Sequence, residues 1–245
     1  MNQARPARPQ VPSHSPSAVL DADCSRLLPL NMSAAHTLSD GLDALGLPLS
    51  AEQQTALLAY LDLLQKWNKV YNLTAVRAQE DMLTHHLLDS LSIIAPLQRA
   101  LADLSLSAPA QVLDVGSGGG LPGVVIAIAC PDVHVTCVDT VAKKAAFIQQ
   151  VAAQLSLPNL RGVHARVESL TDTYDLICSR AFASLVDFTT WSRRALRPGG
   201  VWLAMKGKSP QAEIQALPAD VSVFHVEPLA VPGLDAERCA VWMRG

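Results

Sequence analysis

The sequence lacks several features that define other classes of protein. It holds no apolar run long enough to cross a bilayer, and its N-terminus carries arginines without the apolar core of a signal peptide. Its five cysteines show no paired metal-ligand spacing, and four of them lie in or beside apolar runs. We therefore expect a cytoplasmic protein that has no membrane partner, no disulfides and no bound metal.

The chain also lacks an excess of positive charge. Its formal net charge is -3, which argues against an extended surface that neutralises phosphates, so DNA is not an expected partner and any RNA contact should be local or shape-based. The chain has 245 residues and is 49% hydrophobic, enough for one sizeable core with a small appendage.

The N-terminal third divides into two parts. Residues 1–32 hold five of the 16 prolines and no apolar period, so we expect a disordered extension, with Met32 a candidate for the true start. Residues 33–105 should form a helical cap. Ser50 and Gln53 have capping-box spacing before a helix that should end near Lys69, and a second amphipathic helix is expected over 79–97.

From residue 106 to residue 245 short apolar strands alternate with helices. This alternation predicts an α/β fold with a parallel sheet covered on both faces and ligands at the carboxyl ends of its strands. An antiparallel pair is expected at one edge, over 221–226 and 238–243. The parallel strands are expected at 111–115, 133–139, 160–165, 174–179 and 201–206, and the helices near 122–130, 142–155 and 185–196.

A glycine-rich turn follows the first strand. Gly118, Gly120 and Gly123 match the dinucleotide fingerprint, but Asp114 stands just before the turn and its carboxylate would repel phosphates. We interpret the loop as suited to a cationic ligand without phosphates, such as S-adenosyl-L-methionine. A tight strand-to-helix turn without a ligand is the alternative.

The ends of the later strands supply further candidates. Asp139 is placed to accept hydrogen bonds from ribose hydroxyls, in S-adenosyl-L-methionine or equally in NAD, or else to cap the next helix. Val167 and Glu168 follow the third strand, where they can read an adenine edge. Arg180 should lie over the same end of the sheet, and a surface salt bridge is its alternative role.

Several segments together resemble the small-subunit ribosomal RNA methyltransferase G family, also called glucose-inhibited division protein B. The resemblance covers residues 36–245 and implies a Rossmann-like class I methyltransferase with a seven-stranded sheet. The segments that carry it are WNKVYNLT at 67–74, HxxDSL at 86–91, DVGSGGGLPG at 114–123, SRAFASL at 179–185 and KG at 206–207.

The resemblance also implies an activity. It implies transfer of the methyl group of S-adenosyl-L-methionine to N7 of a guanosine in 16S rRNA near the decoding region, on free RNA or within a small-subunit assembly. The sequence departs from the family pattern at His85 and after Lys144. The implied cofactor contacts are Gly116, Leu121, Val167, Glu168 and Arg180.

Guanine N7 carries a lone pair and no proton, so no general base is expected and catalysis should come from positioning. The chain has neither the Asn/Asp-Pro-Pro-aromatic motif of amino-group methylation nor a Pro-Cys context around Cys178. Candidate substrate contacts are Asn72, His86, Arg180 and Lys206, although His86 also fits a core histidine and Lys206 a solvated strand end. A small-molecule methyltransferase and a non-catalytic adenosyl- or NAD-binding module remain the alternative functions.

Overall fold

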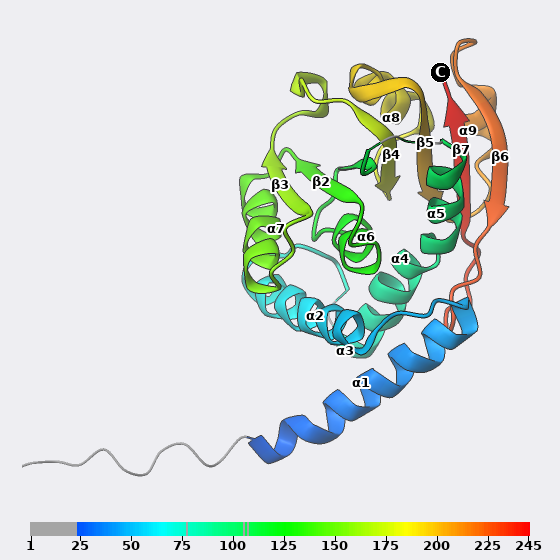
Figure 1. Cartoon of the computed structure of the whole chain (residues 1–245). Helices are drawn as coiled ribbons and strands as arrows, with labels where there is room; N and C mark the ends of the chain where they lie inside the picture. The colour runs from blue at the N-terminus through cyan, green and yellow to red at the C-terminus, as the bar shows by residue number, and fades with distance from the viewer. Residues whose placement is uncertain (1–23, 77, 105, 107) are drawn as a thin grey trace, which may run out of the picture.

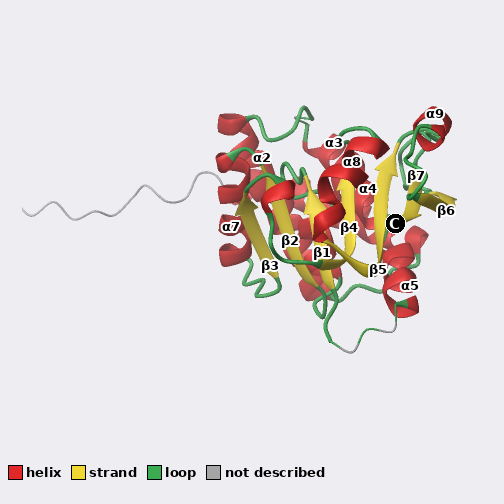
Figure 2. Ribbon diagram, turned by 90° about the horizontal axis from the view of Figure 1, so that it is seen from above, coloured by secondary structure: helices red, strands yellow, loops and turns green. Residues whose placement is uncertain are grey.

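The computed structural model describes residues 24–76, 78–104, 106 and 108–245, and it forms a seven-stranded sheet between layers of helices (Figure 1). The strands run across the molecule in the order β3-β2-β1-β4-β5-β7-β6 (Figure 2). The strands are β1 (Gln111–Val115), β2 (His134–Asp139), β3 (Leu160–His164), β4 (Tyr174–Arg180), β5 (Leu196–Lys206), β6 (Ser222–Pro228) and β7 (Cys239–Arg244).

Strands β1 to β5 pair in parallel, and β7 pairs antiparallel with both β5 and β6. The predicted α/β sheet with an antiparallel edge is therefore confirmed. Side chains alternate between its two faces, as the period of two requires. In β1, Val112 joins the core beneath the N-terminal helices, whereas Leu113 joins the core on the opposite face.

Helices cover both faces of the sheet. The face beneath the N-terminal helices carries α6 (Gly123–Ala129) and α7 (Ala142–Gln154), and the other face carries α8 (Leu185–Ser192). A short helix, α9 (Gln211–Gln215), follows β5. None of the helices in the described part of the chain has the length and apolarity needed to span a bilayer.

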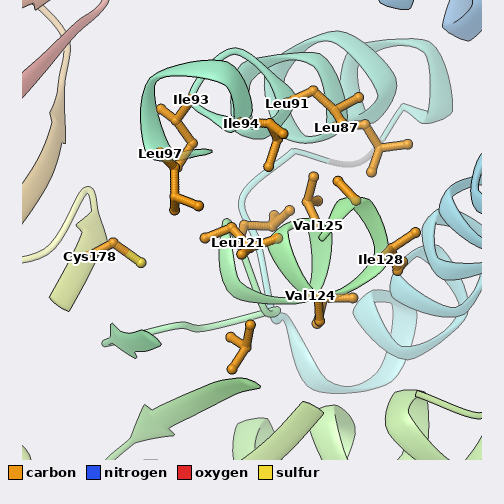
Figure 3. Close-up of a cluster of buried hydrophobic side chains, with 14 of the residues drawn as sticks. Leu87, Leu91, Ile93, Ile94, Leu97, Leu121, Val124, Val125, Ile128 and Cys178 are labelled. Carbon is orange, nitrogen blue, oxygen red and sulfur yellow. The ribbon is translucent and has the colours of Figure 1, made fainter. Parts of the chain in front are cut away.

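The N-terminal helices pack on the sheet domain through a shared core. The helices are α1 (Cys24–Leu45), α2 (Ala51–Tyr71), α3 (Gln79–Met82), a π-helical turn at Leu83–Leu88, α4 (Asp89–Leu91) and α5 (Ile94–Asp103). Leu91 and Ile94 from this region face Val125 and Leu121 around α6 (Figure 3). One hydrophobic core joins the N-terminal helices to the sheet. The division of the chain into a cap at 33–105 and a methyltransferase domain at 106–245 therefore stays a prediction.

Two expectations about the N-terminal region differ from the structure. Helix α1 begins at Cys24, so residues 24–32 are helical where we expected disorder. Of the five prolines in residues 1–32, four precede this helix in the sequence. The rest of the expected extension, residues 1–23, lies outside the described residues. The helix expected over 79–97 is interrupted by the π-helical turn and again before Ile94. An extra residue in the π turn changes the side-chain spacing, and such turns are frequent at functional sites.

Helix α2 is fixed directly to the glycine loop. Its predicted capping box is present, with Ser50 Oγ accepting from Gln53 N–H at 3.3 Å and Gln53 Oε1 accepting from Ser50 N–H at 2.9 Å. The amide of Gln53 also donates to the carbonyl of Ile128 at the end of α6, at 2.8 Å. Further along the same helix, the buried Tyr60 hydroxyl donates to the Gly119 carbonyl at 2.6 Å.

Replacing Tyr60 by phenylalanine should lower the free energy of unfolding by about 1–2 kcal/mol, because the buried Gly119 carbonyl then loses its donor. Urea denaturation measures the change. Tyr71→Phe is the matched control, since it removes a hydroxyl from a side chain that is 39% exposed, and it should leave stability within about 0.5 kcal/mol of wild type. Equal effects of the two variants would contradict a clamping role for Tyr60.

Candidate functional site

A cavity of about 520 Å³ opens at the carboxyl ends of β1, β2, β3 and β4. This is the edge where open parallel sheets bind ligands, and the volume is typical of small-molecule sites. Its walls come from the end of each of these strands and from α7 and α8. Among the predicted site residues, Gly116, Asp139, Val167 and Glu168 line it.

The glycine loop forms one wall of the cavity. Gly116 and Gly118 have φ angles of +67° and +57°, a region that side chains disfavour. A Cβ on Gly116 would also overlap the ring of Phe182. Glycine is therefore required at position 116 for two independent reasons, its backbone angle and the packing of Phe182.

The carboxylate of Asp139 ties this loop to the start of α7. Its Oδ2 accepts from Gly118 N–H at 3.1 Å and lies 3.5 Å from Lys144 Nζ, while its Oδ1 accepts from Val141 N–H at 2.8 Å. The side chain is 6% exposed and lines the cavity. Asp139 thus holds the backbone just before α7, whose N-cap Val141 has no side-chain capping bond, so the predicted capping of that helix is not present; the carboxylate also faces the cavity.

Asp114 does not have the role that its sequence position suggested. Its side chain is fully buried, and its Oδ2 accepts from Gly123 N–H at 2.8 Å at the start of α6. Burial raises its pKa to about 7. Among the described residues, those that line the cavity do not include Asp114, so the interpretation that its charge selects a cationic ligand is not supported.

The far wall of the cavity comes from the segment after β3. Val167 and Glu168 lie in a short 3-10 turn, Val167–Ser169, with Val167 buried. Glu168 has its nearest cation, Arg166 NH1, at 4.0 Å, and its side chain is 43% exposed. An apolar surface and a carboxylate at this position suit the face and the edge of an adenine ring.

Two aromatic residues in the cavity were missed from the sequence. Phe182 follows β4, and Trp191 comes from α8; both line the cavity, with ring centroids 5.9 Å apart in an edge-to-face arrangement. Phe182 lies within the motif that carried the family resemblance, but nothing in the sequence indicated which side chain of that motif faces the cavity.

Arg180 lies at the end of β4 and points toward the N-terminal helices. Its NH1 group donates to Asp89 Oδ2 at 2.7 Å and to the His85 carbonyl at 2.9 Å. Arg238 donates to the other oxygen of Asp89 at 3.0 Å. Asp89 therefore joins the helical region to β4 and to the residue before β7, and Arg180 forms a salt bridge that is largely buried.

His86 is a buried histidine inside this network. Its Nε2 lies 2.7 Å from Thr74 Oγ1, and its Nδ1 lies 3.4 Å from Arg180 NH2. Because an arginine can only donate, Nδ1 is the accepting nitrogen and Nε2–H donates to Thr74. Burial, followed by the charge of Arg180, lowers the pKa of His86 to about 4, so the ring is neutral at neutral pH.

The remaining predicted residues lie elsewhere. Leu121 packs in the hydrophobic cluster around α6 (Figure 3). Asn72 is exposed at the C-terminus of α2, with a left-handed backbone. Lys206 ends β5, where its Nζ pairs with Glu213 at 2.8 Å and donates to the Ala183 carbonyl at 3.1 Å. These three residues are not among those that line the cavity in the described part of the chain.

Comparison with known proteins identifies the family. The model of the rRNA small subunit methyltransferase G family matches residues 53–241. The chain belongs to this family. It is 65% identical over 218 residues to the ribosomal RNA small subunit methyltransferase G of Acidovorax sp. (strain JS42), an alignment that covers 87% of this chain and 96% of that protein. The family predicted from the sequence motifs is therefore confirmed.

A second relative agrees with this assignment, and a solved structure shares the fold. The protein of the same name from Polaromonas naphthalenivorans (strain CJ2) is 63% identical over 208 residues, covering 85% of this chain and 94% of that protein. The crystal structure of coclaurine N-methyltransferase bound to N-methylheliamine and SAH superposes with a TM-score of 0.52 and 12% identity, over 88% of this chain and 94% of that one. The superposition shows the shared fold of class I methyltransferases.

Asp89→Ala should lower the free energy of unfolding by about 3–5 kcal/mol, because it leaves two arginines without their carboxylate in a largely buried place. Asp172→Ala is the matched control. Asp172 pairs with Arg161 at the same 2.7 Å that separates Asp89 from Arg180, but its side chain is 57% exposed, and the exposed pair should contribute no more than about 1 kcal/mol. Chemical denaturation that finds the two losses equal would contradict a structural role for Asp89.

The buried Asp114 carboxyl predicts a pH dependence of stability. Its pKa is raised to about 7 in the folded state, so between about pH 4 and pH 7 the carboxyl is ionised in the unfolded protein but still protonated in the folded one. The free energy of unfolding therefore falls as the pH rises through this range, by ~1.4 kcal/mol per pH unit. Asp114→Asn keeps an acceptor for Gly123 N–H and removes the titration.

The free energy of unfolding of both proteins, measured between pH 4.5 and 7.5, tests this prediction. The variant should gain stability relative to wild type as the pH rises. His86, whose pKa is lowered to about 4, has the opposite slope and is present in both proteins, so it cancels in the difference. Parallel curves would show that Asp114 does not titrate in this range.

Proposed function

We propose that this chain transfers the methyl group of S-adenosyl-L-methionine to N7 of a guanosine in 16S rRNA, near the decoding region. The observation that carries the proposal is the cavity at the carboxyl ends of β1 to β4, which lies within the region that matches the family. Two of the segments that resemble the family line it, through Val115, Gly116, Ala181 and Phe182. The names of the relatives supply the class of RNA, the small-subunit ribosomal RNA. The choice of N7 rests on the resemblance of those motifs.

The residues of the cavity fit the cofactor. In the proposed arrangement the Asp139 carboxylate accepts from the ribose hydroxyls, Val167 packs on the adenine ring and the Glu168 carboxylate accepts from its amino group. The methionine part then lies at the end of the cavity that Gly116 and Phe182 line. The cofactor supplies a methyl group activated by a positively charged sulfur.

Arg180 has a different proposed role from the residues that line the cavity. Its NH1 group donates to Asp89 and to the His85 carbonyl, both in the N-terminal helical region. The guanidinium therefore holds that region against the end of β4. One NH2 hydrogen faces His86 Nδ1, and the donors that are left are proposed to bind a methionine carboxylate or an RNA phosphate. Leu121 contributes through the core beneath the loop, and Asn72 and Lys206 remain proposed RNA contacts.

The chemistry requires positioning and no proton transfer to a protein base. Guanine N7 attacks through a lone pair in the plane of the ring, so the protein has to align that lone pair with the methyl group and exclude water. The neutral His86 is consistent with this requirement, because it is buried and committed to Thr74 and Arg180. The proposed partner is 16S rRNA, free or within an assembling small subunit, which places the reaction in the cytoplasm.

The test incubates the full chain and tritiated S-adenosyl-L-methionine with 16S rRNA, free or in small subunits, from a strain that lacks the gene. We expect one methyl group per RNA, recovered as 7-methylguanosine by mass spectrometry after nuclease digestion. RNA from the parent strain, which already carries the modification, should accept none. Transfer to small molecules alone, or no transfer together with tight binding of NAD, would contradict the proposal.

The cofactor site is tested separately by calorimetry with S-adenosylhomocysteine. Glu168→Ala should weaken binding about tenfold, the usual effect of losing one hydrogen bond. Asp172→Ala, an exposed acid outside the cavity, serves as the control and should bind as wild type does. Unchanged affinity in the Glu168 variant would remove Glu168 from the site.

A further inference from the structure

Phe182 occupies the end of the cavity where the reaction should take place. In the proposed arrangement the adenine lies beside the segment after β3. Strands β2 and β1 lie between β3 and β4, so the carboxyl ends of β3 and β4 are three strand spacings apart, about 14 Å. An extended cofactor with its adenine beside β3 and its ribose beside β2 directs its methionine end toward β1 and β4. Phe182, directly after β4 and in contact with Gly116, is the aromatic residue at that end.

The backbone around Phe182 is held in an unusual conformation. Ala181 and Ala183, on either side of it, have φ angles of +51° and +41°, which alanine rarely adopts. Such a conformation is unfavourable for alanine and persists only where the surroundings impose it. This double turn aims the phenylalanine side chain back toward the loop of β1.

Contacts on both sides of Phe182 hold this conformation. Lys206 donates to the Ala183 carbonyl at 3.1 Å and to Glu213 Oε2 at 2.8 Å. The same Glu213 oxygen accepts from Leu185 N–H at 2.7 Å. On the other side, Trp191 meets the Phe182 ring edge-to-face and is itself 39% exposed. The turn is therefore held by Lys206 on one side and by Trp191 on the other, with Phe182 lining the cavity between them.

We infer that Phe182 is the stacking platform for the target guanine, with Trp191 fixing the angle of its ring. This inference rests on the proposed function and names the residue that orients the substrate. Stacking fixes the plane of the base, and the N7 lone pair lies in that plane. Holding the plane therefore aims the lone pair at the methyl group.

The charge balance of the reaction adds a second role for the aromatic ring. The N7 lone pair forms the new N–CH₃ bond while the S–CH₃ bond breaks, and the electron pair of that bond stays on sulfur. The sulfur becomes a neutral thioether, and the purine ring acquires the positive charge. An aromatic face binds a cationic ring more strongly than a neutral one, so Phe182 favours the transition state over the bound substrate.

The test measures single-turnover methyl transfer to 16S rRNA from a strain lacking the gene, at saturating RNA and cofactor. Phe182→Ala should reduce the rate constant about 10- to 100-fold, the range found when a stacked base loses its aromatic partner. Phe182→Leu, which keeps an apolar side chain in the turn, should be reduced similarly. Phe182→Trp should stay close to wild type, because it restores an aromatic face.

Two controls separate stacking from folding and from cofactor binding. Phe224→Ala removes an aromatic side chain that is 47% exposed on β6, where Arg244 covers its ring at 4.4 Å, and it should leave the rate unchanged. Affinity for S-adenosylhomocysteine should stay within about twofold of wild type in Phe182→Leu.

A second readout does not depend on activity. In the presence of S-adenosylhomocysteine, the wild type should bind 7-methylguanosine monophosphate more tightly than guanosine monophosphate, and Phe182→Leu should lose that preference.

Three results would overturn the inference. The first is a wild-type rate of methyl transfer in Phe182→Leu. The second is a loss of affinity for S-adenosylhomocysteine in that variant as large as its loss of rate. The third is a preference for 7-methylguanosine monophosphate that is absent from the wild type or that survives in Phe182→Leu. Failure of the wild type to methylate the RNA at all would instead overturn the proposed function.

Discussion

The site depends on one buried carboxylate, that of Asp139. It accepts a hydrogen bond from the glycine loop through Gly118 and another from Val141 at the start of α7, and it pairs with Lys144 on that helix. Two walls of the cavity are therefore held at a fixed separation by a single side chain that is 6% exposed. The same group faces the cavity, so the residue that shapes the site is also the one that the proposal assigns to the ribose.

The N-terminal helices complete this arrangement from the other side of the loop. Tyr60 donates to the Gly119 carbonyl, and Asp89 joins the helical region to Arg180 at the end of β4 and to Arg238 before β7. These contacts fix the ends of separate strands relative to one another before any ligand arrives. Such rigidity suits a methyl transfer that needs alignment of the reacting atoms and no proton transfer to a protein base.

The sequence predicted those parts of the structure that follow from local patterns. Alternating strands and helices predicted the sheet, and the rule that ligands bind at the carboxyl ends of parallel strands predicted the positions of Asp139, Val167 and Glu168. Asp114 was misread because alternation turns its side chain to the face covered by α6, away from the cavity. Asp89, the partner of Arg180, lies 91 residues away in the sequence and directly follows the π-helical turn. The spacing of residues in the sequence therefore did not indicate this pair. The orientation of Phe182 depends on the positive φ angles of Ala181 and Ala183. Alanine rarely adopts this conformation, so the sequence did not indicate it.

The central claim is that the cavity at the ends of β1 to β4 holds the methyl donor, with its reactive end beside Phe182. A crystal structure of the full chain with S-adenosylhomocysteine tests this most directly. We predict ribose hydroxyls at Asp139, the adenine beside Val167 and Glu168, and the sulfur at the end of the cavity formed by Gly116 and Phe182. A ligand bound elsewhere, or one with its sulfur at the Glu168 end, would contradict it.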